Sequence, residues 1–137
     1  MSNIERSKYW LCVTYPDSFD LDLWLNQDFF GNLSGVISPL HCKDNENLKP
    51  HYHCIFDFGG RNVTQNGALF VLGDLPANKH LEKPSNLFAC ERYLTHYDNP
   101  DKEQFYKDGE LYQAGRFCRI VGNYAFHLES YKSDDKL

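Results

Sequence analysis

The chain has 137 residues, of which 42% are apolar and 15% aromatic, and this is enough to bury one hydrophobic core. The composition excludes a disordered chain, and no apolar run approaches the roughly 20 residues that a membrane span needs. A formal net charge of −5 argues against a protein that coats nucleic acid by charge alone.

The first ten residues, MSNIERSKYW, are polar and lack the apolar stretch of a secretory signal. The five cysteines are odd in number, widely spaced and without a CxxC pair, which argues against a disulfide framework or a zinc ribbon. We therefore expect a cytoplasmic protein with reduced thiols, mostly buried except for that of Cys42.

The first half of the chain alternates between strand and helix patterns. Residues 7–16 are rich in aromatic and β-branched side chains, which predicts a strand. Residues 18–32 carry a helical apolar stripe, with Ser18 or Asp20 as the cap. Residues 33–42 and 51–58 predict two further strands, joined by a polar turn of hairpin length.

The second half begins with a weak helix at residues 62–75 and a short strand at 80–82. A better helix follows, capped by Ser85 and ended by Asn99 and Pro100, and an edge strand is expected within residues 115–121. This order predicts an α+β domain in which a central antiparallel sheet of about five strands is flanked by helices. We assign residues 1–131 to this domain and residues 132–137 to a polar tail.

The third predicted strand carries two histidines on one face. Because side chains alternate along a strand, Tyr52, Cys54 and the phenylalanines after them face the core, while His51 and His53 face the other way. Two neutral imidazoles on one face can reach a single divalent cation. Exposed surface histidines are the alternative for an isolated HxH pair.

The preceding strand ends at His41, and Asp44 follows three residues later. The hairpin would place both beside His51 and His53, which gives three imidazoles and a carboxylate at the ends of adjacent strands. Mixed nitrogen and oxygen ligands suit Mn²⁺ or Mg²⁺, and zinc is an alternative.

The helix after residue 85 has a core stripe of Leu87, Cys90, Leu94 and Tyr97 at about 100° per residue. Tyr93 lies beside this stripe, with the small Ala89 one turn earlier and His96 three residues later. A boundary tyrosine with its hydroxyl in water is the ordinary interpretation of such a position.

Three segments together, ISPLHCKD, KPHYH and RYLTHYDNPDK, resemble the replication initiators of small rolling-circle plasmids of the streptococcal type. These belong to the HUH endonucleases, which are named for two histidines around a bulky residue, here His51-Tyr52-His53. The opening YWLCVTYPDS is similar to their first strand, so that the resemblance covers about residues 7–115. It implies a ferredoxin-like (RRM-like) architecture and a bacterial plasmid replicon.

The resemblance implies roles for individual residues. His41, Asp44, His51 and His53 would be metal ligands, and Tyr93 would be the nucleophile. Cys42 stands where the family usually has an aspartate, so one acidic position is lost. Tyr97 stands where the family usually has a charged residue; at a spacing of four from Tyr93 it is an auxiliary candidate nucleophile, although its place on the core stripe favours packing.

The expected activity is nicking and joining of one DNA strand at an origin, through a 5′-phosphotyrosine and a free 3′-hydroxyl. The cation would act as a Lewis acid, and His96 is an auxiliary candidate for accepting the tyrosine proton. The expected partners are the origin duplex and its single-stranded nick site, without a membrane, and with a homo-oligomer open for a longer parent protein. Six basic residues lie near the motifs as candidate DNA contacts: Lys43, Lys49, Arg61, Lys79, Lys83 and Arg92.

Two other classes of function stay open at this point. A small metal-dependent oxygenase that uses HxH plus a carboxylate predicts many short strands and no essential tyrosine. A non-catalytic metal-binding or binding-only module predicts no metal-dependent chemistry.

Overall fold

The computed structural model describes residues 5–26, 33–42, 49–99, 101–102, 105 and 118–127. Its main sheet is antiparallel and four-stranded, in the order β2-β4-β3-β6. These strands are β2 (Tyr9–Thr14), β3 (Ser34–Ile37), β4 (Tyr52–Asp57) and β6 (Arg119–Val121). A second, two-stranded antiparallel sheet pairs β1 (Arg6–Ser7) with β5 (Val63–Thr64). The α+β class with antiparallel pairing is confirmed.

In the part of the chain that the structure describes, the main sheet has four full strands, whereas the sequence predicts about five. The expected strand at residues 80–82 is reduced to one bridge, in which Leu11 and Glu82 exchange backbone hydrogen bonds of 2.8 and 2.9 Å. Pro84 follows two residues later and has no N–H to donate, so the pairing cannot extend in that direction. The bridge still covers part of the β2 edge.

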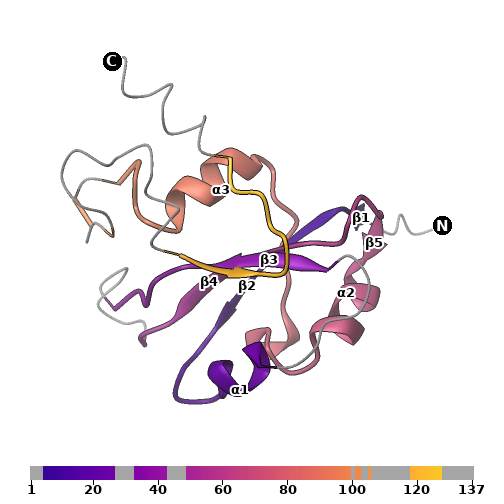
Figure 1. Ribbon diagram of the computed structural model, residues 1–137, viewed down its shortest axis with the longest axis horizontal. Coiled ribbons are helices and arrows are strands. Elements are labelled where there is room, and N and C mark those ends of the chain that lie inside the picture. Colours follow the sequence, from indigo (N-terminus) through magenta and orange to yellow (C-terminus); the bar gives the residue numbers. More distant parts are fainter. Residues whose placement is uncertain are drawn as a thin grey trace.

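The helices lie on both faces of the sheet, with α3 on one side and α1 and α2 on the other (Figure 1). Helix α1 (Leu21–Leu25) begins at Asp20, whose carboxylate accepts from the Leu23 N–H at 3.0 Å. Of the predicted helix over residues 18–32, residues 27–32 lie outside the described part. Helix α2 (Gln65–Leu72) is capped by Thr64, and a short 3₁₀ turn, η1 (Ala77–Lys79), follows it.

Helix α3 (Leu87–Tyr93) begins one residue later than the sequence predicts. Asn86 rather than Ser85 is its cap, because the Asn86 side chain accepts from the Ala89 N–H at 3.1 Å. Among the described residues, no helix is long and apolar enough to cross a membrane.

The side-chain alternation along β4 divides the interior into two cores. Cys54, Phe56 and Phe58 pack with residues of α1 and α2, and the Trp24 ring meets Phe56 edge-on at 5.8 Å. Ile55 packs on the opposite face with Val36 and Leu94, beneath α3. This split confirms the predicted division of β4 into two faces. His53 therefore belongs to the face that α3 covers.

A buried carboxylate ties α3 to the segment after β6. Glu91 lies within α3 and is 0% exposed. Its carboxylate accepts hydrogen bonds from the Tyr124 hydroxyl and from the backbone N–H of His127, and His127 Nδ1 lies 2.9 Å from Oε2. Because an unpaired buried carboxylate is very costly, these contacts fix the position of α3 on the sheet.

We predict that Tyr124 makes the fold sensitive to alkaline pH. Burial raises the pKa of its phenol, and the bond to Glu91 raises it further. The unfolded tyrosine ionises near pH 10 while the folded one stays protonated. Stability from this group is therefore fully present below about pH 10 and falls by about 1.4 kcal/mol per pH unit above it.

Urea unfolding of the wild type and Tyr124→Phe at pH 7 and pH 11 measures this effect. At pH 7 the variant should be less stable by about 1–3 kcal/mol, because Glu91 loses a donor. At pH 11 the difference should be smaller by roughly 1 kcal/mol. An equal difference at both pH values would contradict the assignment.

Candidate active site

Three histidines from two adjacent strand ends meet on the α3 face of the sheet. His41 and His51 form an antiparallel bridge with backbone N–H···O distances of 2.8 and 3.0 Å, and His53 follows within β4. His41 and His51 are buried, and His53 is half-buried. The prediction that an antiparallel pairing brings His41 beside His51 and His53 is confirmed.

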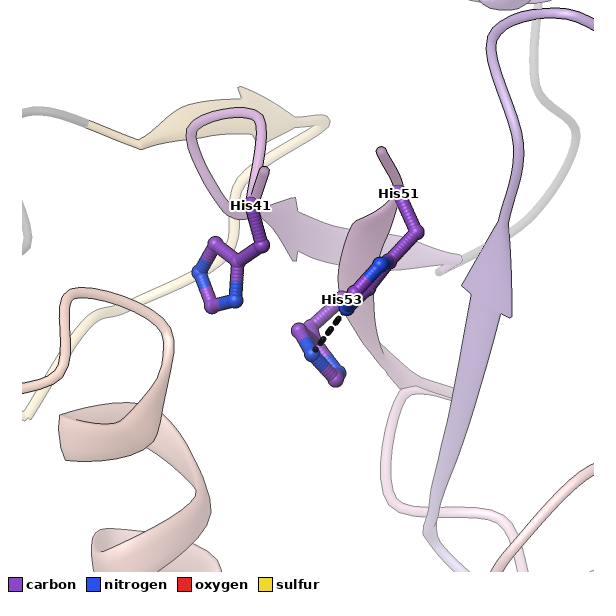
Figure 2. A group of neighbouring side chains, drawn as sticks. All are labelled: His41, His51 and His53. Atoms are coloured by element: carbon purple, nitrogen blue, oxygen red, sulfur yellow. Dashed lines mark hydrogen bonds between the residues drawn. The ribbon is translucent and has the colours of Figure 1, made fainter. Parts of the chain in front are cut away.

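Backbone carbonyls orient two of the three rings. Nε2 of His41 lies 2.8 Å from the Leu94 carbonyl oxygen, and Nδ1 of His51 lies 2.7 Å from that of Lys49. Since a carbonyl can only accept, each of these nitrogens carries the proton. In His41 the other ring nitrogen then lies on the side of His51 and His53 (Figure 2). Such bonds typically fix the tautomer of a metal-binding histidine.

The remaining ring nitrogens converge. Nε2 of His51 and Nε2 of His53 are 3.1 Å apart, and ligand atoms of all three histidines lie within 4.8 Å of one another (Figure 2). Two nitrogens that share one small divalent cation at 90° are separated by about 3.0 Å. The three-imidazole set therefore fits a divalent cation after a small movement of His41.

The acidic member of the predicted set, Asp44, lies outside the described residues, as does Lys43. Its role stays a prediction. All five cysteines are free thiols, and Cys42 is the exposed one, as expected.

Tyr93 is the last residue of α3, and its half-buried ring lies against the histidines. Its centroid is 5.1 Å from that of His53, 5.9 Å from that of His41 and 5.2 Å from that of His96, with edge-on geometry in each case. The fold thus brings the Tyr93 phenol into contact with histidines that are far from one another in the sequence.

Helix α3 ends at Tyr93, earlier than the predicted stop at Asn99 and Pro100. The Tyr97 N–H bonds to the Arg92 carbonyl at 3.0 Å and the His96 N–H to the Tyr93 carbonyl at 3.1 Å, which is a Schellman motif. His96 takes the left-handed position of this motif, with φ of 60°, where glycine is usual. Tyr97 therefore lies in the turn and does not share a helical face with Tyr93.

His96 is 1% exposed, which contradicts the surface-facing position that is usual for a helix histidine. Its ring centroid lies 4.2 Å from that of His41 and 5.4 Å from that of Phe105. Phe105 in turn stacks on His41 with the planes 6° apart. The turn after α3 thus packs His96 and Phe105 around the His41 ring, and His96 stays close to Tyr93.

Lys102 is a residue of this site that the sequence reasoning missed. Its Nζ donates to the Tyr93 phenolic oxygen at 3.0 Å and lies 4.9 Å from the ring centroid. The signal was present in the segment RYLTHYDNPDK, because a chain that turns sharply after a helix can bring a lysine back to the helix end. Nothing in the spacing alone identifies which lysine returns.

The predicted DNA-contacting residues are scattered, and several carry nearby negative charge. Three are paired with aspartates: Lys49 with Asp17, Lys79 with Asp74, and Arg92 with Asp98. Arg61 is exposed beyond the end of β4 that lies away from the histidines, and Lys83 is exposed before α3. Their contact with DNA stays a prediction.

We predict that the effect of the left-handed backbone at His96 on stability can be measured separately from the effect of its imidazole ring. His96→Gly and His96→Ala both remove the imidazole, but only alanine has a Cβ at positive φ. The glycine variant should be more stable than the alanine variant by about 1 kcal/mol.

The same pair of substitutions at Arg92, inside α3, is the matched control and should give the reverse order, with glycine less stable by about 1 kcal/mol. Thermal or urea unfolding measures all four variants. The same order at both positions would contradict the Schellman assignment.

Comparison with known proteins gives one family match and one curated relative. Residues 2–117 match the family described as "Plasmid replication protein, origin binding domain". A curated relative, "Replication protein RepB" of Lactiplantibacillus plantarum, is 32% identical over 118 residues, which are 82% of this chain and 51% of the relative. The chain thus spans about half the length of that relative. The chain belongs to the family of plasmid replication protein origin-binding domains.

Proposed function

We propose that this domain nicks and rejoins one DNA strand at a plasmid replication origin, with Tyr93 as the nucleophile. One observation carries the proposal: the Tyr93 phenol stands beside three converging imidazoles in a chain of the origin-binding family. A phenol beside a cation site is a suitable arrangement for phosphoryl transfer, because that reaction depends mainly on positioning and charge stabilisation.

The proposed step is an in-line displacement at one phosphodiester. The Tyr93 oxygen forms a bond to phosphorus and gives up its proton, while the bond between phosphorus and the 3′ oxygen breaks. The products are a 5′-phosphotyrosine and a 3′-hydroxyl that has taken up a proton. The reverse step joins the ends, and no external energy source is needed because the ester bond is conserved.

His41, His51 and His53 would hold the divalent cation, with Asp44 as a further proposed ligand. Mn²⁺ or Mg²⁺ bound there would supply Lewis-acid stabilisation of the phosphate oxygens. The protein's own contribution is orientation, since the Leu94 and Lys49 carbonyls hold two of the rings. His96, packed between His41 and Tyr93, is a candidate for the group that accepts the phenolic proton.

The proposed partners are the origin duplex and its single-stranded nick site, in a bacterial cytoplasm. Contacts with phosphates are proposed for the basic residues that the sequence indicates, with aspartates beside three of them limiting non-specific affinity.

We predict that Tyr93→Phe abolishes capture of DNA. Wild-type protein with Mn²⁺ and single-stranded oligonucleotides covering the origin should give a covalent adduct, seen as a slower band on a denaturing gel. Without the phenolic oxygen no adduct can form.

Tyr97→Phe is the matched control, because it removes the same atom four residues away, and it should retain the adduct. An adduct that survives in Tyr93→Phe and disappears in Tyr97→Phe would move the nucleophile to Tyr97. If the wild type forms no adduct with any of a broad panel of origin oligonucleotides, the proposal is wrong and a binding-only module is favoured.

Lys102 is a further proposed contributor to the same reaction, because it contacts the Tyr93 hydroxyl. Its ammonium donates to the atom that becomes negatively charged when Tyr93 attacks and again when it leaves. A hydrogen bond to a charged group contributes about 1.5–3 kcal/mol. We therefore assign Lys102 to stabilising the phenolate in both directions.

Lys102→Met should lower kcat for cleavage on the order of 10- to 100-fold with little change in KM. Rejoining should slow by the same factor, so the equilibrium between intact and cleaved DNA stays unchanged, and Lys102→Arg should recover part of the rate. Lys8→Met, an exposed lysine beside β1, is the control. A raised KM with unchanged kcat would instead make Lys102 a phosphate contact.

A further inference from the structure

A cavity of about 810 Å³ lies between the β2 edge of the sheet and α3. His53 and Tyr93 form part of its wall, and it extends to Ala77 and Asn78 in η1 and to the bridge residue Glu82. Its volume is within the range of about 300–1,000 Å³ that small-ligand sites occupy. Because Tyr93 is part of its wall, the cavity is next to the place where a phosphodiester would meet the Tyr93 phenol.

The charge of the cavity argues against a phosphate inside it. Its described lining contains no lysine or arginine, and Glu82 supplies a carboxylate. Burial raises the pKa of the Cys12 and Cys90 thiols, so both remain neutral near pH 7. Away from the histidines, a DNA backbone would meet the Glu82 carboxylate without a lysine or arginine to offset it, whereas a neutral ring carries no charge to be repelled.

The lining of the cavity combines apolar side chains with a few polar ones. Apolar side chains of the sheet and of α3 line it, among them Leu11, Ile55 and Ala89. Asn78 and Asn86 add carboxamides. The Asn86 oxygen is engaged as the α3 cap, so its amide hydrogens are the groups it can offer. An apolar lining with a few hydrogen-bonding groups suits a heteroaromatic ring.

We propose that this cavity receives one unpaired nucleobase of the strand that carries the scissile phosphate. The base next to that phosphate turns into the cavity, stacks on the apolar wall, and presents its edge to Asn78 and Asn86. A base inside a duplex cannot enter, so the cavity selects single-stranded DNA at the nick and contributes to sequence choice there. This inference rests on the proposed function, because Tyr93 sets where the phosphate lies.

An abasic scan tests the inference without catalysis. Metal-free Tyr93→Phe protein is titrated with single-stranded origin oligonucleotides, each lacking one base, and binding is followed by fluorescence anisotropy. Removal of one base beside the nick should weaken binding by roughly 5- to 100-fold, since burying the apolar faces of the ring contributes about 25 cal/mol per Å². Equal binding of all the abasic oligonucleotides would overturn the inference.

A cavity-filling variant locates the base. Ala89→Leu in the same background should bind the intact and the abasic oligonucleotide equally, because the space is already filled. Ala125→Leu, at an exposed alanine after β6, is the matched control and should keep the difference. Should Ala89→Leu fail to fold, Asn78→Gly carries the test, because glycine tolerates the φ of 57° at this position, with exposed Asn66→Ala as its control. A full abasic effect in a folded cavity variant would overturn the location.

The proposed Tyr93 chemistry and the proposed base site in the cavity can be disproved independently of each other. An abasic effect that depends on Ala89, in a protein that never forms an adduct with DNA, would leave the cavity assignment in place and remove the Tyr93 chemistry. A Tyr93 adduct together with equal binding of all the abasic oligonucleotides would do the opposite.

Discussion

The antiparallel pairing of His41 with His51 is the constraint on which the site depends. Two backbone hydrogen bonds of 2.8 and 3.0 Å set the register, and the β3–β4 ladder continues it into the sheet. A slip of one residue would turn His51 and His53 to the opposite face, into the core beneath α1 and α2. The register is thus specified by burial, because Cys54 and Phe56 are nearly inaccessible only when the histidines face α3.

The second layer of the site comes from α3 and the turn that ends it. Leu94 packs in the core beneath this helix, and its carbonyl holds the His41 ring. The Schellman turn then brings His96 against His41, while Glu91 anchors the helix through Tyr124 and His127. The same short segment therefore supplies core packing, a backbone acceptor and the Tyr93 phenol. These contacts fix the position of the segment, as the proposed phosphoryl transfer would require.

The sequence predicts those structural features that depend only on residues close together in the chain. The face split of β4 follows from strict alternation, and the Asp20 cap follows from one carboxylate before an apolar stripe. The features that sequence reasoning missed or placed elsewhere depend on contacts that the local pattern does not contain. Glu91 is buried because of groups 33 and 36 residues away, and α3 stops because His96 accepts a left-handed backbone in a packed environment. Lys102 reaches Tyr93 only through the path of the turn.

The central claim is that the three histidines form one cation site next to Tyr93, and titration with Mn²⁺ by calorimetry tests it most directly. We expect one binding site for Mn²⁺, with an affinity that is at least about tenfold weaker in His53→Ala. Tyr93→Phe and His80→Ala should bind as the wild type does, since His80 is exposed and pairs with Glu82. Equal affinity in the wild type and His53→Ala, or no binding by the wild type, would contradict it.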